Sequence, residues 1–160
     1  MNDEQRKVRK FYKEFLSWKA ENIGVWIGAG FIEVLFAVMM MIPYQEMLHD
    51  PGLFVFPVLF GWLGPMLYLK PYQTFAEGQQ QCSIYEKIKY LPIDLKEIRK
   101  MRVVYLVSFV GKIFPIMMIL QLLCAYWSFK EITIANIIYA IGMGFVLPVL
   151  GNLPGAVIGK

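Results

Sequence analysis

The chain alternates between long apolar runs and short polar or basic stretches. Four runs are long enough to cross a bilayer, whose hydrocarbon core of about 30 Å takes roughly 20 helical residues. These predicted spans cover approximately residues 23–42, 53–69, 103–126 and 132–151. The pattern therefore predicts an all-α fold, a polytopic membrane protein with about four transmembrane helices.

The stretch ahead of the first span has a helical period instead of a continuous apolar run. At 100° per residue, its apolar side chains fall on one arc: Val8, Phe11, Tyr12, Phe15, Leu16 and Trp18. Most of its basic residues fall on the opposite arc, and this combination is typical of a helix lying in the lipid interface. We therefore predict an amphipathic interfacial helix within residues 1–21, followed by one helical membrane domain over residues 22–160. The alternative is a solvated charged helix.

Composition agrees with a membrane protein. Of the 160 residues, 58% are hydrophobic and 18% charged, with a mean hydropathy of +0.50, whereas soluble domains run near half apolar and a quarter charged. The net charge of +4 is concentrated beside the spans: six of the 16 basic residues precede residue 20 and seven lie in residues 70–102. No basic stripe with interleaved base-stacking aromatics is present, so nucleic acid is not an expected partner.

The distribution of Lys and Arg between the spans predicts the orientation. The N-terminal segment carries six, residues 44–52 carry none, residues 70–102 carry seven, and residues 127–131 carry one. Because basic loops stay on the cytoplasmic side, both termini and the 70–102 loop are expected in the cytoplasm. The predicted location is the cell membrane, crossed four times.

The long cytoplasmic loop carries its own helix signals. Ser83 with Glu86 three residues later forms a capping box that opens a helix. Pro92 ends this helix, because the residue before a proline is pushed out of the helical conformation. Asp94 with Glu97 forms a second capping box. We therefore predict a short cytoplasmic helix, a break, and a basic helix that continues into the third span.

Two charged residues fall inside predicted spans. Glu33 lies roughly 15 Å from the cytoplasmic end of the first span, and Lys112 roughly 14 Å from that of the third, at 1.5 Å per residue. An unpaired charge near mid-bilayer costs at least about 2.5 kcal/mol, so we predict that Glu33 and Lys112 form an ion pair. The pair is either a structural clamp or a proton or substrate relay. The clamp is favoured, because no other span carries an Asp or Glu.

Small and polar residues inside the spans predict helix contacts. Gly24 and Gly28 have the spacing that permits close helix approach, and packing within the chain is favoured over homodimerisation. Gln121 and Asn136 are expected to form hydrogen bonds between helices.

Motifs for catalysis and metal binding are missing from the sequence. No phosphate-binding loop ending in GK[ST], no HExxH and no GxSxG occurs. Cys82 and Cys124 lack metal-ligand spacing, and His49 is predicted on the opposite side of the membrane from Cys82. We therefore expect no enzyme activity, no cofactor and no metal site.

The order of these parts resembles the N-terminal half of permeases in type-2 ATP-binding-cassette exporters. The segment that carries the resemblance is SIYEKIKYLPIDLKEIRKMR, residues 83–102, which is similar to the LP-[IV]-[SD]-x-K/R-E-I stretch common in that family. In the family, the first helix of this loop docks onto a separate ATPase. The resemblance places that role on five residues: Ile84, Tyr85, Ile88, Leu91 and Pro92. The N-terminal helix likewise resembles the family's elbow helix.

The resemblance covers roughly residues 1–130, and the chain departs from the family in having four predicted spans where six are usual. A half-length permease is expected to form a homodimer, to join a longer permease, to serve as an accessory subunit, or to be a nonfunctional fragment. The leading hypothesis is a permease-like subunit of an ATP-driven exporter, coupled to a separate ATPase through residues 83–102. The alternative is a non-transporting membrane interaction, immunity or accessory protein, in which the loop only anchors lipid headgroups.

Overall fold

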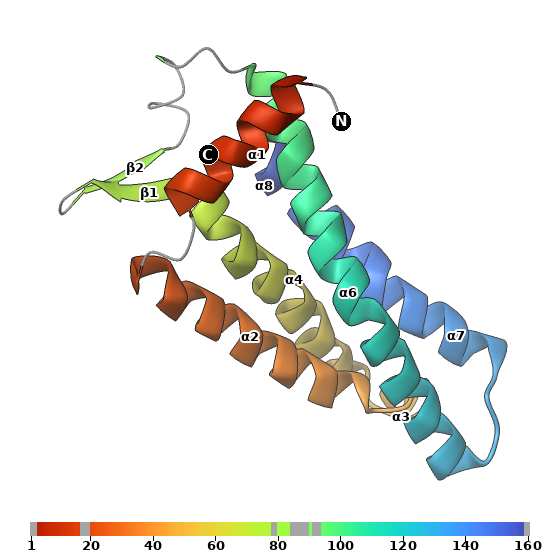
Figure 1. Cartoon of the computed structure of the whole chain (residues 1–160). Coiled ribbons are helices and arrows are strands. Elements are labelled where there is room, and N and C mark those ends of the chain that lie inside the picture. Colours follow the sequence, from red (N-terminus) through yellow and green to blue (C-terminus); the bar gives the residue numbers. More distant parts are fainter. Residues whose placement is uncertain (1–2, 17–19, 78–79, 84–89, 91–93, 159–160) are drawn as a thin grey trace.

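The computed structural model describes residues 3–16, 20–77, 80–83, 90 and 94–158. Within this part, the chain is a bundle of long helices with a small β-hairpin at one end (Figure 1). The elements are, in chain order, α1 (Asp3–Leu16), α2 (Ala20–Met40), α3 (Tyr44–His49), η1 (Pro51–Phe54), α4 (Val55–Leu69), η2 (Lys70–Tyr72), β1 (Thr74–Glu77), β2 (Gln80–Ser83), α6 (Leu95–Phe129), α7 (Ile134–Ile141), η3 (Gly142–Val146, a π-helical turn) and α8 (Leu147–Ile158).

Four helical runs in the described residues are long and apolar enough to cross a membrane, which confirms the predicted fold class. They are α2, the run from η1 through α4 to η2, α6, and the run from α7 through η3 into α8. The last run continues to Ile158, past the predicted end near Gly151, because α8 accommodates Pro154 within the helix. At 1.5 Å per residue, the 35 residues of α6 extend about 52 Å, which is longer than a 30 Å hydrocarbon core.

The outer face of α2 is apolar and exposed, as suits a helix that spans a membrane. Ile27, Phe31, Val34 and Val38 are each at least half exposed and form one continuous apolar stripe. In water such a stripe favours association or aggregation, whereas in a bilayer it contacts acyl chains.

The helices pack as two neighbouring pairs, α2 beside α4 and α6 beside the run from α7 to α8 (Figure 1). Leu69, Leu106, Val110 and Ala156 form a buried cluster that joins α4, α6 and α8. Buried positions in the fourth run recur every four residues: Asn136, Ala140, Gly144, Pro148, Asn152 and Ala156.

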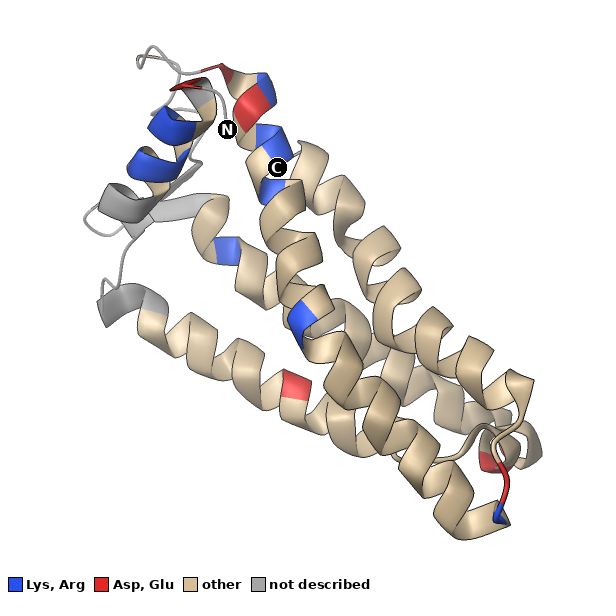
Figure 2. Ribbon diagram, turned by 45° about the vertical axis from the view of Figure 1, so that its right-hand side comes forward, with Lys and Arg blue, Asp and Glu red and all other residues tan. Residues whose placement is uncertain are grey.

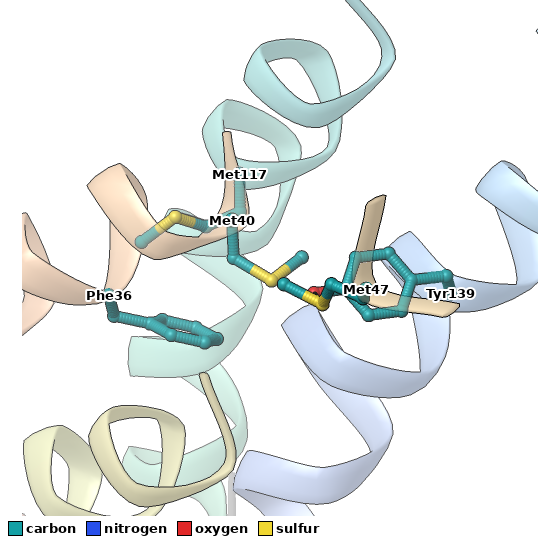
Figure 3. Close-up of a cluster of buried hydrophobic side chains, with 5 residues drawn as sticks. All are labelled: Phe36, Met40, Met47, Met117 and Tyr139. Carbon is teal, nitrogen blue, oxygen red and sulfur yellow. Dashed lines mark hydrogen bonds between the residues drawn. The ribbon is translucent and has the colours of Figure 1, made fainter. Parts of the chain in front are cut away.

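A second buried cluster joins the short helix α3 to three membrane-length runs. Figure 3 shows the thioether side chains of Met40, Met47 and Met117 lying between the rings of Phe36 and Tyr139. The Tyr139 hydroxyl donates a hydrogen bond to Met47 Sδ at 3.0 Å. Methionine side chains adapt to irregular spaces, and here they fill the region where α2, α3, α6 and α7 meet.

Basic residues gather at one end of the bundle, which carries α1, η2 and residues 95–102 of α6 (Figure 2). We call this the basic end. The hairpin β1–β2 lies there too (Figure 1). Between this end and the opposite one the ribbon is almost entirely free of charged positions, as expected for the part of a protein that meets the bilayer core.

Candidate functional site

The predicted docking segment lies outside the described residues. Ile84, Tyr85, Ile88, Leu91 and Pro92 all fall within residues 84–89 or 91–93. The structure does describe the elements on both sides of the segment, and Tyr90 within it is 83% exposed. The hairpin β1–β2 precedes the segment, and the start of α6 follows it.

The flank before the segment is the antiparallel hairpin β1–β2. Thr74 pairs with Ser83 and Glu77 with Gln80. The sequence predicts no strands here, because any alternation covers only four residues on each side of the turn, too few for a period-2 signal. Ser83 thus belongs to a strand as well as to the predicted capping box.

The flank after the segment is the start of α6, where the predicted cap is partly present. The Asp94 side chain caps the helix by accepting a hydrogen bond from the Lys96 N–H at 2.8 Å. Glu97 does not complete the reciprocal half of a capping box; its carboxylate pairs instead with Lys100, one turn later. α6 therefore begins firmly at Leu95, one residue after the cap.

The apolar face of α1 packs on this start of α6. Val8, Phe11, Tyr12 and Ile98 form a buried cluster, while Arg6 and Arg9 on the opposite face of α1 are exposed. The amphipathic pattern predicts an interfacial helix with its apolar side in lipid. In the structure, the described apolar positions of α1 are covered by protein, because η2 and α6 stand beside it at the basic end.

Arg102 is the charged residue that this contact encloses. Its side chain is fully buried, and its Nε donates a hydrogen bond to the Tyr12 hydroxyl at 3.3 Å. The Tyr12 hydroxyl in turn donates a hydrogen bond to the Tyr72 carbonyl oxygen at 3.5 Å. The rings of Tyr12, Tyr72 and Tyr105 pack against one another, with Tyr72 and Tyr105 stacked at 4.7 Å. From the sequence, Arg102 is indistinguishable from the other basic residues of the 70–102 loop.

The predicted ion pair between Glu33 and Lys112 is not formed. Glu33 on α2 is buried, with 9% of its surface exposed, and its carboxyl lies against Gly64 of α4. Lys112 lies on the exposed face of α6, whose buried face carries Val110 and Met117. The two residues lie at similar depths along their helices, but Lys112 is about 200° away from the buried Val110 around the axis of α6, so it faces away from the bundle.

Glu33 lines a small cavity at the centre of the bundle. The cavity has a volume of about 10 Å³, and its lining comes from α2, α4, α6, η3 and α8. The lining residues are Glu33, Phe36, Gly61, Pro65, Val110, Ile113, Gly144 and Pro148. The cavity thus places one carboxyl among apolar side chains and glycines.

The small residues divide into packed and open positions. An added Cβ at Gly61 would lie 3.1 Å from Phe36, and one at Gly144 would lie 3.3 Å from Phe114, so both glycines allow close packing within the chain. At Gly24 and Gly28 an added Cβ would meet nothing within 4 Å among the described residues. The favoured prediction of packing within the chain is therefore wrong for Gly24 and Gly28.

Polar side chains tie the helices together at a position that was not predicted. The Asn152 Nδ2 of α8 donates hydrogen bonds to the carbonyl oxygens of Trp62 at 3.0 Å and of Pro148 at 2.9 Å. Gln121 and Asn136, which were expected to form hydrogen bonds between helices, are fully buried. Their side-chain amides form no hydrogen bond within the part of the chain that the structure describes.

Comparison of the chain with protein-family models, with curated proteins and with solved structures gave no match. Within the described residues, no three His, Cys, Asp or Glu side chains lie close enough together to hold a metal ion. Two places in the molecule are therefore candidate functional sites, the basic end and the Glu33 cavity.

Proposed function

We propose that this chain is the membrane subunit of an ATP-driven exporter, moved by a separate ATPase that binds residues 83–102. The observation that supports the proposal best is the continuity of α6. The helix begins at Leu95, three residues after Pro92, the last of the proposed docking residues, and runs to Phe129 without interruption, Pro115 included. A displacement imposed at its first turn is carried along the helix axis through the whole bilayer.

The packing at the basic end supports this role. α1 lies against the first turns of α6, and the buried Arg102 is held by Tyr12 from α1. A force applied to the docking segment therefore moves α1 and α6 together, because separating them would expose a buried guanidinium that has lost its hydrogen bond to Tyr12. Coupling between a soluble motor and a membrane helix needs such a stiff connection.

The orientation and the partners follow from the same proposal. The basic end faces the cytoplasm, where Lys and Arg accumulate beside membrane spans. The partner within the bilayer is a second copy of the chain or a longer permease. Gly24 and Gly28 on α2 are among the open glycine positions, where another helix can approach closely.

The test is co-purification of the full chain with an ATPase from its native membrane. Changing Tyr85, Ile88 and Leu91 together to Ser is expected to reduce the bound ATP-hydrolysing activity about tenfold or more, since apolar anchors carry most of the affinity of an interface. Tyr126→Ser is the control, because Tyr126 is 54% exposed and lies at the opposite end of α6 from the proposed docking residues. Undiminished ATPase binding by the triple variant would contradict docking through this loop.

Absence of any ATPase from the purified complex would favour the other class of function. The chain would then be a non-transporting interaction, immunity or accessory protein of the membrane. The same purification identifies the membrane complex that it accompanies.

A further inference from the structure

The carboxyl of Glu33 occupies a space that the bundle leaves only for it. The side chain projects from α2 to Gly64 on α4, and a Cβ added to Gly64 would overlap the carboxylate. Only glycine at this position allows the two helices to enclose the acid. The contact is therefore specific, and it buries an ionisable group deep within a membrane-spanning helix.

The cavity beside the carboxyl is the size of a single small molecule. Its volume of about 10 Å³ is close to the space that one water needs. Among its lining residues, Glu33 is the one with an ionisable or hydrogen-bonding side chain. Polar partners for the carboxyl must therefore come from the main chain or from a water molecule.

Two glycines supply the main chain that lines the cavity, and each stands four residues before a proline that lines it too. In an α-helix the carbonyl of Gly61 would accept a hydrogen bond from residue 65. Residue 65 is proline, which has no N–H to donate, so the Gly61 carbonyl lacks its usual donor. Gly144 lies in the π-helical turn η3, where a carbonyl pairs with the N–H five residues on, so only the Gly61 carbonyl loses its donor to a proline.

No cationic side chain is among the described residues that line this cavity. The described residues of α4, η3 and α8 include no Asp, Glu, Lys, Arg or His, and on α6 the nearest charged position, Lys112, is on the exposed face. An ionised Glu33 would therefore face carbonyl oxygens and apolar side chains without a compensating charge. A protonated Glu33 would face acceptors suited to its O–H.

We propose that Glu33 is an intramembrane proton-binding site, whose O–H donates to the main-chain carbonyl of Gly61, directly or through one water. The proton is bound to a carboxyl oxygen of Glu33. It is taken up from water and released to water. A hard metal cation fits the site poorly, because such ions take about six oxygen ligands in proteins and the cavity offers one carboxyl and the Gly61 carbonyl. Loss of the proton would oppose the contact of α2 with Gly64, so proton occupancy is coupled to the packing of α2 on α4.

Infrared spectroscopy of the purified full chain in detergent tests this site. At pH about 7 an exposed Glu, with an ordinary pKa of about 4.3, is ionised, so a carbonyl stretch from a protonated carboxyl reports an unusual site. We expect this band in the native chain and its loss in Glu33→Gln. Glu131→Gln, at an exposed position outside the bundle, is the matched control and keeps the band. Glu33→Gln is expected to melt at the native temperature, because an amide replaces a neutral acid of the same shape.

Three results would overturn the proposal: no protonated-carboxyl band at neutral pH, a band that survives in Glu33→Gln, or a band abolished when NaCl replaces choline chloride, which would indicate a cation site. If Glu33→Gln does not fold, the native chain is treated with dicyclohexylcarbodiimide, which reacts with protonated carboxyls in apolar surroundings. Mass mapping should then find Glu33 modified and Glu131 unmodified. The reverse pattern would also exclude the site.

Discussion

Gly64 has no side chain, and this leaves room for the Glu33 carboxyl in the contact between α2 and α4. The Glu33 carboxyl fills the space where a Cβ would stand, so the two residues act as one packing unit. Neighbouring Gly61 is less demanding, since a Cβ there would lie 3.1 Å from the edge of the Phe36 ring. A single methyl group can therefore have very different effects at two positions one helical turn apart.

Gly64→Ala is expected to destabilise the bundle by about 1–3 kcal/mol, the usual cost of inserting a methyl group into a packed interior. Thermal unfolding in detergent measures the effect. Adding Glu33→Ala should recover most of the loss, because the colliding carboxyl is then removed. Gly111→Ala is the control, since a Cβ there meets nothing within 4 Å. It should be neutral or stabilising by up to about 1 kcal/mol. Equal losses at both glycines would show that the contact with Glu33 is unimportant.

At this scale, sequence predicts the depth of a residue better than the side of the helix on which it lies. The depths of Glu33 and Lys112 follow from counting along the helix. The side does not, because a membrane helix is apolar on its lipid face and on its packed face alike, so α6 has almost no amphipathic pattern to distinguish them. The burial of Arg102 was missed for a related reason: a basic residue at the start of a span usually indicates a headgroup contact, and its partner Tyr12 is 90 residues away.

Among the helices, α1 is the element whose role changed most between sequence and structure. Its amphipathic period is visible in the sequence, but a period does not reveal whether the apolar face meets lipid or protein. The structure places Val8, Phe11 and Tyr12 against α6. The start of α6 was more predictable, because capping by Asp94 depends on neighbouring residues alone.

Tyr12→Phe is expected to loosen α1 from α6. The change removes the hydroxyl that accepts from the buried Arg102, at a cost of about 1–3 kcal/mol. Faster tryptic cleavage at the basic residues of α1 would report the detachment. Tyr90→Phe, at a position that is 83% exposed, should leave the cleavage rate unchanged. An unchanged rate in Tyr12→Phe would mean that the hydrogen bond to Arg102 contributes little to holding α1.

The whole molecule is a bundle whose existence the sequence could predict and whose internal arrangement it could not. Four long apolar runs are sufficient to identify membrane-crossing helices, because few other structures satisfy the backbone in lipid. The Glu33 cavity forms only where α2, α4, α6 and the fourth run meet, and none of these contacts is local in sequence. The clustering of basic residues at one end is the feature that gives the bundle a direction.

Cysteine accessibility tests that direction. In a Cys124→Ala background, a membrane-impermeant maleimide should leave Cys82 unlabelled in intact cells and label it after permeabilisation. Glu131→Cys, with both native cysteines replaced, should show the opposite behaviour, since residue 131 lies in the connection at the other end. Labelling of Cys82 from outside intact cells would reverse the proposed orientation and remove the docking segment from the reach of a cytoplasmic ATPase.

The π-helical turn η3 sets the rotational phase of everything that follows it. Four residues of an α-helix turn about 400°, so a strict four-residue repeat of inward positions would wander about 40° further around the axis at each step. In η3 the Leu147 N–H donates to the Gly142 carbonyl, five residues back. This wider turn rotates the chain by less per residue and so offsets part of the 40° displacement. One residue fewer in this turn would swing α8 by about 100°. Asn152 would then leave the Trp62 carbonyl, so the junction between the second and fourth crossings depends on a single extra residue ten positions upstream.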